Sequence, residues 1–229
     1  MIRVDPGDAV TTITLDRPDR RNALDHDALA DLRTSIEAVS APVTYLHGAG
    51  TAFCAGADLG MVRAVADDPD AAHDLAAAGQ RTMDAIADAD TVVVAGVDGP
   101  ARGGGVELAV ACDLRVATPD GSFAAPGVDL GIFGAWGGTR RLPQILGRGR
   151  AMDLTLRGHA IDAATAERWG LVTEVTDRPR AVAERVADGD PGAVAALKRL
   201  LRAEQDRAAT NAAEAAAFAE LASVAAADL

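Results

Sequence analysis

Apolar residues change their spacing along this chain, and the spacing indicates which segments form strands and which form helices. Short apolar runs predict strands at residues 10–15, 43–46, 92–97 and 114–117. Helices are predicted between these strands, over residues 26–39, over residues 71–87 and through residue 111. Because strand and helix alternate, the pattern favours an α/β fold built on a mainly parallel sheet.

Polar residues mark the boundaries of several of these elements. Asp25 stands where a helix N-cap is expected, just before apolar residues that recur at helical spacing. Residues 67–70 form an acidic patch broken by Pro69, which predicts a surface loop. After Arg148 the pattern is largely helical, apart from a strand expected at residues 172–175 and an alanine-rich helical region over residues 193–227.

Charge is the most unusual feature of the composition. The 229 residues carry a net charge of −12, and Lys198 is the only lysine. An acidic surface almost free of lysine suits a cytoplasm of high salt, where screening removes self-repulsion. A GC-rich genome, which favours Arg, Ala and Asp codons, is the alternative explanation. Either way nucleic-acid binding is disfavoured, because the chain has no basic stripe.

Length and apolar content predict one large domain, or a domain with a small helical appendage. No apolar run approaches the ~20 residues of a membrane-spanning helix, and residues 1–6 lack the pattern of a signal peptide. We therefore expect a cytoplasmic protein without a membrane partner. Cys54 and Cys112 lie in small, apolar surroundings, so we expect buried thiols rather than a disulfide, and their number and spacing fit no metal site.

Two glycine-containing loops carry the candidate chemistry. Gly103–Gly105 follows the strand at 92–97 and opens a helix, and residues 54–58 follow the strand at 43–46 in the same way. A strand that breaks at small residues and restarts as a helix leaves backbone N–H groups without partners, and these suit a developing oxygen anion. Glu107, two residues past the glycines, is well placed to move a proton beside that anion. This arrangement indicates enolate chemistry.

Further motifs accompany the two loops, and together they resemble the enoyl-CoA hydratase/isomerase (crotonase) superfamily from about Val10 to Val175. The matching segments lie at residues 12–18, 21–24, 53–59, 103–107, 111–115, 137–143, 163–166 and 170–172. The resemblance implies a crotonase-like spiral of β-β-α units with an acyl-CoA-binding core over residues 1–175. A C-terminal helical region follows at residues 176–229 and is short for the family. The resemblance also implies a homotrimer or a dimer of trimers.

The resemblance assigns roles to individual positions. The substrate is an acyl-CoA thioester; coenzyme A enters as part of it, and no separate cofactor or metal is expected. The thioester oxygen is held by the N–H groups of Ala57 and Gly104, and Glu107 is the catalytic acid or base. Residues expected to contact the substrate are Ala55, Gly56, Asp58, Leu59, Gly103 and Arg21. Arg21, with Arg20, has the geometry for a coenzyme A phosphate, although solvated surface arginines are nearly as plausible.

One position departs from the hydratase pattern. Hydratases of the family carry a second glutamate just after a proline, and here Gly127 follows Pro126. Asp129 is the only nearby acid that can substitute, and a turn or capping role is the alternative. The position of a later acid in some isomerases matches Ala135, and Trp136 replaces a small residue and is expected to narrow the acyl pocket. Enoyl-CoA hydratase/isomerase activity is the first expectation. Decarboxylation of a malonyl-type thioester and a non-catalytic acyl-CoA-binding subunit remain open.

Overall fold

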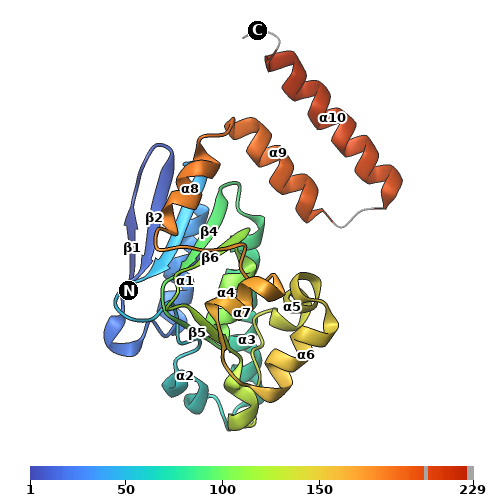
Figure 1. Cartoon of the computed structure of the whole chain (residues 1–229). Helices are drawn as coiled ribbons and strands as arrows, with labels where there is room; N and C mark the ends of the chain where they lie inside the picture. The colour runs from blue at the N-terminus through green and yellow to red at the C-terminus, as the bar shows by residue number, and fades with distance from the viewer. Residues whose placement is uncertain (204–205, 226–229) are drawn as a thin grey trace.

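A six-stranded sheet forms the centre of the computed structural model, which describes residues 1–203 and 206–225 (Figure 1). Its strands, in spatial order, are β1 (Ile2–Asp5), β2 (Val10–Leu15), β3 (Val43–Gly48), β4 (Val92–Val97), β6 (Leu114–Ala117) and β9 (Glu174–Val175). Only the β1–β2 pair is antiparallel, and the other neighbours are parallel. The expected α/β architecture with a mainly parallel sheet is confirmed.

A second, three-stranded sheet carries the site-forming loops. It consists of β5 (Pro100–Arg102), β7 (Ser122–Ala124) and β8 (Ile161–Asp162), with β7 in the middle. Two isolated parallel bridges, Cys54 to Ala101 and Leu24 to Ala57, extend this sheet sideways. The segments around residues 24, 54–57 and 101 are therefore joined by backbone pairing where the loops leave the main sheet.

The two faces of the main sheet are covered differently. Ile13, Leu46 and Ala95 are aligned in register and fully buried in the main core. The helices α1 (His26–Glu37), α3 (Pro69–Asp88) and α4 (Gly104–Ala111) lie on one side of the sheet, with α8 (Arg180–Ala187) on the other (Figure 1). Smaller helical elements surround the loops: η1 (Pro18–Arg20), α2 (Leu59–Ala64), η2 (Pro126–Leu130), α5 (Gly138–Leu146), α6 (Arg148–Arg157) and α7 (Ala163–Trp169).

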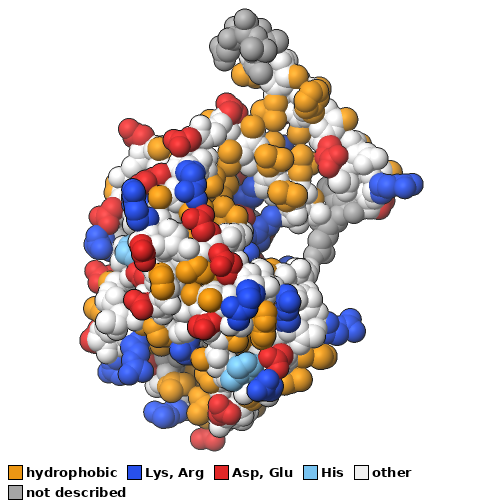
Figure 2. Space-filling model, viewed as in Figure 1, with side chains coloured by type: hydrophobic (Ala, Val, Ile, Leu, Met, Phe, Trp, Pro, Cys, Tyr) orange, Lys and Arg blue, Asp and Glu red, His pale blue; other side chains and the backbone are white. Residues whose placement is uncertain are grey.

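The C-terminal helices α9 (Pro191–Arg202) and α10 (Arg207–Ala225) form an arm that projects from the body (Figure 1). Asp113 anchors the arm, because its carboxylate lies 2.9 Å from Lys198 Nζ and accepts a 2.9 Å hydrogen bond from Arg202 Nε. Figure 2 shows hydrophobic side chains gathered along the arm. Exposed apolar residues of its two helices are Leu197, Leu201, Phe218 and Val224.

Most sequence-based boundaries are confirmed to within a few residues. The predicted surface loop at residues 67–70 is wrong in its second half: Asp68 caps α3 and Pro69 begins it, as the fixed φ of proline allows at a first helical position. The strand expected at residues 172–175 is confined to β9. Of the alanine-rich region, residues 204–205 and 226–227 lie outside the described residues, and two helices fill most of the remainder.

Two smaller expectations concern the cysteines and membranes. Cys54 and Cys112 are both free and buried, as predicted. Burial raises the pKa of both thiols to about 12, so neither is a reactive thiolate at neutral pH. Within the described residues, no helix combines the length and apolar character needed to cross a bilayer.

Candidate active site

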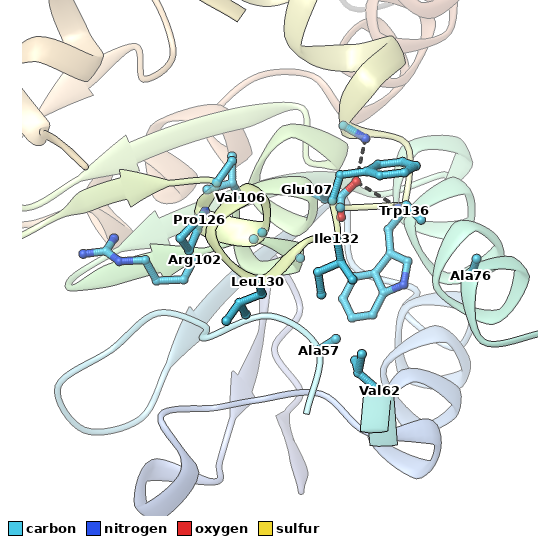
Figure 3. Close-up of a pocket in the computed structure, with 18 of the residues that line it drawn as sticks. Ala57, Val62, Ala76, Arg102, Val106, Glu107, Pro126, Leu130, Ile132 and Trp136 are labelled. Carbon is cyan, nitrogen blue, oxygen red and sulfur yellow. Dashed lines mark hydrogen bonds between the residues drawn. The ribbon is translucent and has the colours of Figure 1, made fainter. Parts of the chain in front are cut away.

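A cavity of about 300 Å³ opens between the two glycine-containing loops (Figure 3). Glu107 is the only acidic residue and Arg102 the only basic one among the described residues that line it. The rest of the lining is mostly apolar and includes Ala57, Val62, Leu75, Leu130, Ile132 and Trp136. An apolar chamber with one carboxylate suits a hydrocarbon chain whose chemistry takes place at one end.

Glu107 lies in the first turn of α4 and is only 4% exposed. Its Oε1 accepts two hydrogen bonds of 2.8 Å each, from the backbone N–H groups of Trp136 and Gly138 at the start of α5. Its Oε2 is buried and has no hydrogen-bond partner among the described residues. One oxygen of the carboxyl group is therefore held by two backbone donors, while the other accepts no hydrogen bond from a described residue.

Burial raises the pKa of Glu107 above its ordinary value, because the cavity withholds water from the charged form. The two backbone donors on Oε1 and the charge of Arg141 oppose this shift. Arg141 is itself buried, donates to the carbonyl of Trp136 at 3.2 Å, and lies 2.6 Å from Asp84. A carboxyl group with a raised pKa is a stronger base when ionised, which suits proton abstraction from carbon.

Glycines at two positions let α5 and the segment before it approach this carboxyl. A Cβ at Gly134 would lie 2.5 Å from Oε2 of Glu107, and one at Gly138 would lie 2.9 Å from Oε1. Contacts this short do not occur, so a larger residue at either position would displace the carboxyl. Sequence reasoning missed Gly134, although it is one of several glycines between residues 127 and 138.

Ala57 and Gly104, the two predicted backbone donors, both line the cavity. No hydrogen bond from Ala57 N–H or Gly104 N–H to another described residue is present. Gly104 is the first residue of α4, whose N–H has no intrahelical acceptor. Gly56 has a φ of +85°, and a Cβ there would lie 2.8 Å from the nitrogen of Gly104, so only glycine lets the two loops touch.

Trp136 forms one wall of the cavity, as expected from its size (Figure 3). Its ring is wedged between two glycines: a Cβ would lie 2.0 Å from Nε1 if built on Gly79 and 2.3 Å from Cζ3 if built on Gly104. The ring is 4% exposed and packs in the core as well as against the cavity. The indole therefore limits the space beside the Gly104 donor.

The other expected site residues fall into two groups. Ala55, Leu59 and Gly103 line the cavity. Asp58 instead caps α2, with Oδ1 accepting from Gly60 N–H at 2.8 Å, and Arg21 is exposed and outside the lining. The cavity therefore brings together residues of both loops, but three of the expected substrate contacts, Gly56, Asp58 and Arg21, lie outside its lining.

The segment that departs from the hydratase pattern lies at the cavity wall. Gly127 lines the cavity, whereas Asp129 is exposed and is absent from the lining. The structure does not bring Asp129 to Glu107. A Cβ at Gly127 would lie 2.9 Å from the carbonyl oxygen of Ile132, so a side chain here requires a shift of the loop.

Known proteins resemble this chain over most of its length. The family model described as enoyl-CoA hydratase/isomerase matches residues 5–227. A Mycobacterium bovis protein named "probable enoyl-CoA hydratase" is 37% identical over 206 residues, which cover 88% of this chain and 82% of the relative. Carnitinyl-CoA dehydratase of Proteus mirabilis is 36% identical over 86% of this chain and 78% of its own length.

Solved structures show the same fold. The enoyl-CoA hydratase of Thermoplasma volcanium superposes with a TM-score of 0.91 at 28% identity, covering 97% of this chain and 92% of that one. The enoyl-CoA hydratase of Bacillus anthracis superposes with a TM-score of 0.87 at 32% identity, covering 95% and 89% respectively. The crotonase-like architecture expected from the sequence is thus confirmed.

Proposed function

The chain belongs to the enoyl-CoA hydratase/isomerase family, and from that membership we propose that it forms the enolate of an acyl-CoA thioester beside Glu107. The observation that carries the proposal is the carboxyl of Glu107, whose Oε1 is held by two N–H groups while Oε2 is buried and unpartnered among the described residues. The two unused donors, Ala57 N–H and Gly104 N–H, supply the matching site for the thioester oxygen.

In the proposed reaction a 3-enoyl thioester loses a proton from its second carbon to Oε2 of Glu107. The electron pair of that C–H bond moves into the thioester, and the resulting oxygen anion accepts hydrogen bonds from Ala57 N–H and Gly104 N–H. Glu107 then returns the proton to the fourth carbon. The double bond moves from the third and fourth carbons to the second and third, and the carboxylate is regenerated.

A single carboxylate makes this proton shuttle easier than hydration. Addition of water to a double bond requires a group that holds and deprotonates the water, together with one that protonates the alpha carbon. Gly127 brings no carboxylate to the cavity wall, and Asp129 lies outside the lining. We therefore place isomerisation ahead of hydration for this chain, and within hydration we assign the water to Glu107 alone.

Two alternatives rest on the same observation. Decarboxylation of a malonyl-type thioester needs stabilisation of the enolate oxygen and no second carboxylate, so the pocket accommodates it. A non-catalytic acyl-CoA-binding subunit would keep the pocket and the donors while having no use for a base. The retained, tightly held Glu107 argues against that second alternative.

The test is incubation with 3-enoyl-, 2-enoyl- and malonyl-type CoA thioesters, with products identified by mass and NMR. We expect a 3-enoyl thioester to be isomerised faster than a 2-enoyl thioester is hydrated. Faster hydration would overturn the order of the two reactions. If no thioester reacts while a saturated acyl-CoA still binds, the binding-subunit alternative replaces the enzymatic one.

Assembly and surroundings form a separate part of the proposal. We propose a homotrimer or a dimer of trimers in which the projecting arm contacts other copies. Its support is the set of apolar side chains on the arm, of which Leu201 is 84% and Phe218 is 74% exposed. The charge of −12 supports a cytoplasm of high salt as the working environment.

Salt should strengthen this assembly, because subunits of the same charge repel one another at low ionic strength. The Debye length falls from ~10 Å at 0.1 M to ~3 Å at 1 M, which removes most repulsion between exposed charges. Light scattering across this range measures the mass directly. A mass that does not change with salt would leave the high-salt proposal without support.

A further inference from the structure

Two neighbouring residues before the first loop adopt an unusual backbone conformation. Arg21 has a φ of 51° and Asn22 a φ of 57°, and they are the only non-glycine residues with positive φ in the described part of the chain. Residues other than glycine seldom occupy this left-handed region, and asparagine tolerates it better than most. Such conformations persist only where surrounding contacts hold them. The contacts of Asn22 therefore show which part of the structure depends on its left-handed backbone.

The side chain of Asn22 is 1% exposed and bonded at both ends. Its Oδ1 accepts the backbone N–H of Arg17 at 3.0 Å. Its Nδ2 lies 2.9 Å from the carbonyl oxygen of Ala49, 2.7 Å from that of Ala52 and 3.3 Å from that of Phe53. The three carbonyls belong to the segment that leads into the first loop, so the amide ties that segment to residues 17–22.

Residues 21–24 then run alongside residues 55–58 as a short parallel pair. Ala55 N–H donates to Arg21, Leu24 N–H donates to Gly56, and Asp58 N–H donates to Leu24, at 2.8 to 2.9 Å. Leu24 thus bonds to the residues on either side of Ala57, and the N–H of Ala57 stays out of this ladder. A shift of register by one residue would turn that N–H into the ladder and away from the cavity.

We propose that Asn22 is a positioning residue for catalysis. Its buried amide and left-handed backbone set the register of residues 21–24 against 55–58, and this register aims Ala57 N–H at the thioester oxygen. The inference rests on the proposed enolate chemistry. Asn22 lies outside the cavity lining and would not contact the substrate, but it would control the direction of one of the two donors, Ala57 N–H.

The test uses butanoyl-CoA carbon-13 labelled at the thioester carbonyl, which is saturated and can be neither hydrated nor isomerised. Infrared difference spectra report polarisation of the bound carbonyl, and exchange of alpha protons in heavy water reports enolate formation. In Asn22→Gly the backbone keeps its left-handed conformation but the amide is lost. We expect a smaller downshift of the carbonyl band and an exchange rate lower by on the order of 10², with affinity for butanoyl-CoA changed only a few fold.

Thr82→Val is the matched control, because Thr82 is also 1% exposed and its hydroxyl donates to the carbonyl of Leu29 at 3.1 Å, away from both loops. The control should lose stability but keep the carbonyl band and the exchange rate. Asn22→Asp, which has the same shape and tolerates the same backbone, repeats the test if the glycine variant is not recovered folded.

The outcomes separate this inference from the proposed function. An unshifted carbonyl band and no exchange in the wild type would overturn the enolate chemistry itself. A normal wild type together with an Asn22 variant that keeps the full band shift and exchange rate would overturn the positioning role alone. So would equal losses in the Asn22 and Thr82 variants, because that result shows an effect of stability only.

Discussion

The two loops that supply backbone donors reach the same cavity by different structural means. Gly104 begins α4, and all eight residues of that helix are buried. Ala57 precedes α2, which has six residues and no buried residue at all. The free N–H of Gly104 follows from helix geometry alone, because the first N–H groups of any helix lack intrahelical acceptors. That of Ala57 depends on pairing with residues 21–24.

The contrast shows that equivalent chemical groups can differ in how they are secured. The second loop also presents Glu107, so one buried helix carries a proposed donor and the proposed proton-transfer group together. The first loop presents only a donor, and side-chain and backbone bonds from elsewhere hold it. We expect damage to the second loop to affect chemistry most, and damage around the first loop to affect carbonyl polarisation.

The largest effect is expected at Glu107. Glu107→Gln keeps the shape and an oxygen that can accept from Trp136 N–H and Gly138 N–H, but it cannot take a proton from carbon. Turnover should fall by ~10²–10⁴, while affinity for the CoA thioester stays within a few fold. Steady-state kinetics and calorimetry measure the two quantities. Glu184→Gln, on the exposed surface of α8, is the control, and full activity in Glu107→Gln would remove Glu107 from the mechanism.

The next largest effect is expected at Gly104, whose N–H is the proposed donor at the start of α4. In Gly104→Ala the new methyl meets the Trp136 ring, which has to move and carry the loop or the indole with it. We expect kcat/KM to fall by about 10², the loss typical of one displaced donor. Adding Trp136→Ala removes the clash and should restore much of the loss. A double-mutant cycle on kcat/KM measures this coupling, and purely additive losses would argue against the steric explanation.

A smaller effect is expected from pH. Because burial raises the pKa of Glu107 above the ordinary value of 4.5, the base is protonated over a wider acidic range. The acidic limb of the profile of kcat/KM should therefore lie above pH 4.5, with about a tenfold loss for each pH unit below it. Glu107→Gln should lack this limb in its residual activity. A limb at or below pH 4.5 would contradict the assignment of buried Glu107 as the base.

The raised pKa of Glu107 also predicts how folding stability depends on pH. Because the pKa of Glu107 is higher in the folded than in the unfolded state, the folded state binds the proton more tightly. The contribution of Glu107 to folding stability is therefore fully present below the unfolded pKa and is lost as pH rises through the folded pKa. Glu107→Gln, which stays neutral, should gain stability relative to the wild type as pH rises. Thermal unfolding of both proteins across that range measures the difference. A constant difference at all pH values would show that Glu107 does not titrate with folding.

The smallest effect is expected at Gly127, in the cavity wall. Gly127→Glu would add the carboxylate that the wall lacks, and should raise hydration of a 2-enoyl-CoA relative to isomerisation. The gain is limited, because a Cβ here lies 2.9 Å from the carbonyl oxygen of Ile132. Product ratios by NMR measure the change. Rapid hydration by the wild type, undiminished in Asp129→Asn, would show that one glutamate suffices.

Local features of the structure could be predicted from the sequence. The strands at 10–15, 43–46 and 114–117 and the capping role of Asp25 are found where the pattern places them. The free N–H of Gly104 and the placement of Glu107 in the first turn of a helix follow in the same way. These properties depend on the conformations of a few consecutive residues, and hydrophobic period and glycine position report those conformations directly.

The tertiary structure alone decided which groups meet. Glu107 is held by N–H groups of residues 29 and 31 positions further along the chain, and Trp136 is seated between two glycines from different helices. Asn22 bonds to carbonyls 27 to 31 positions away, and Asp129 lies outside the cavity lining although it is close to Gly127 in sequence. Such contacts depend on how whole elements pack and on the direction of each side chain. Neither produces a regular spacing of residue types along the chain, because each contact involves single residues that are far apart in sequence.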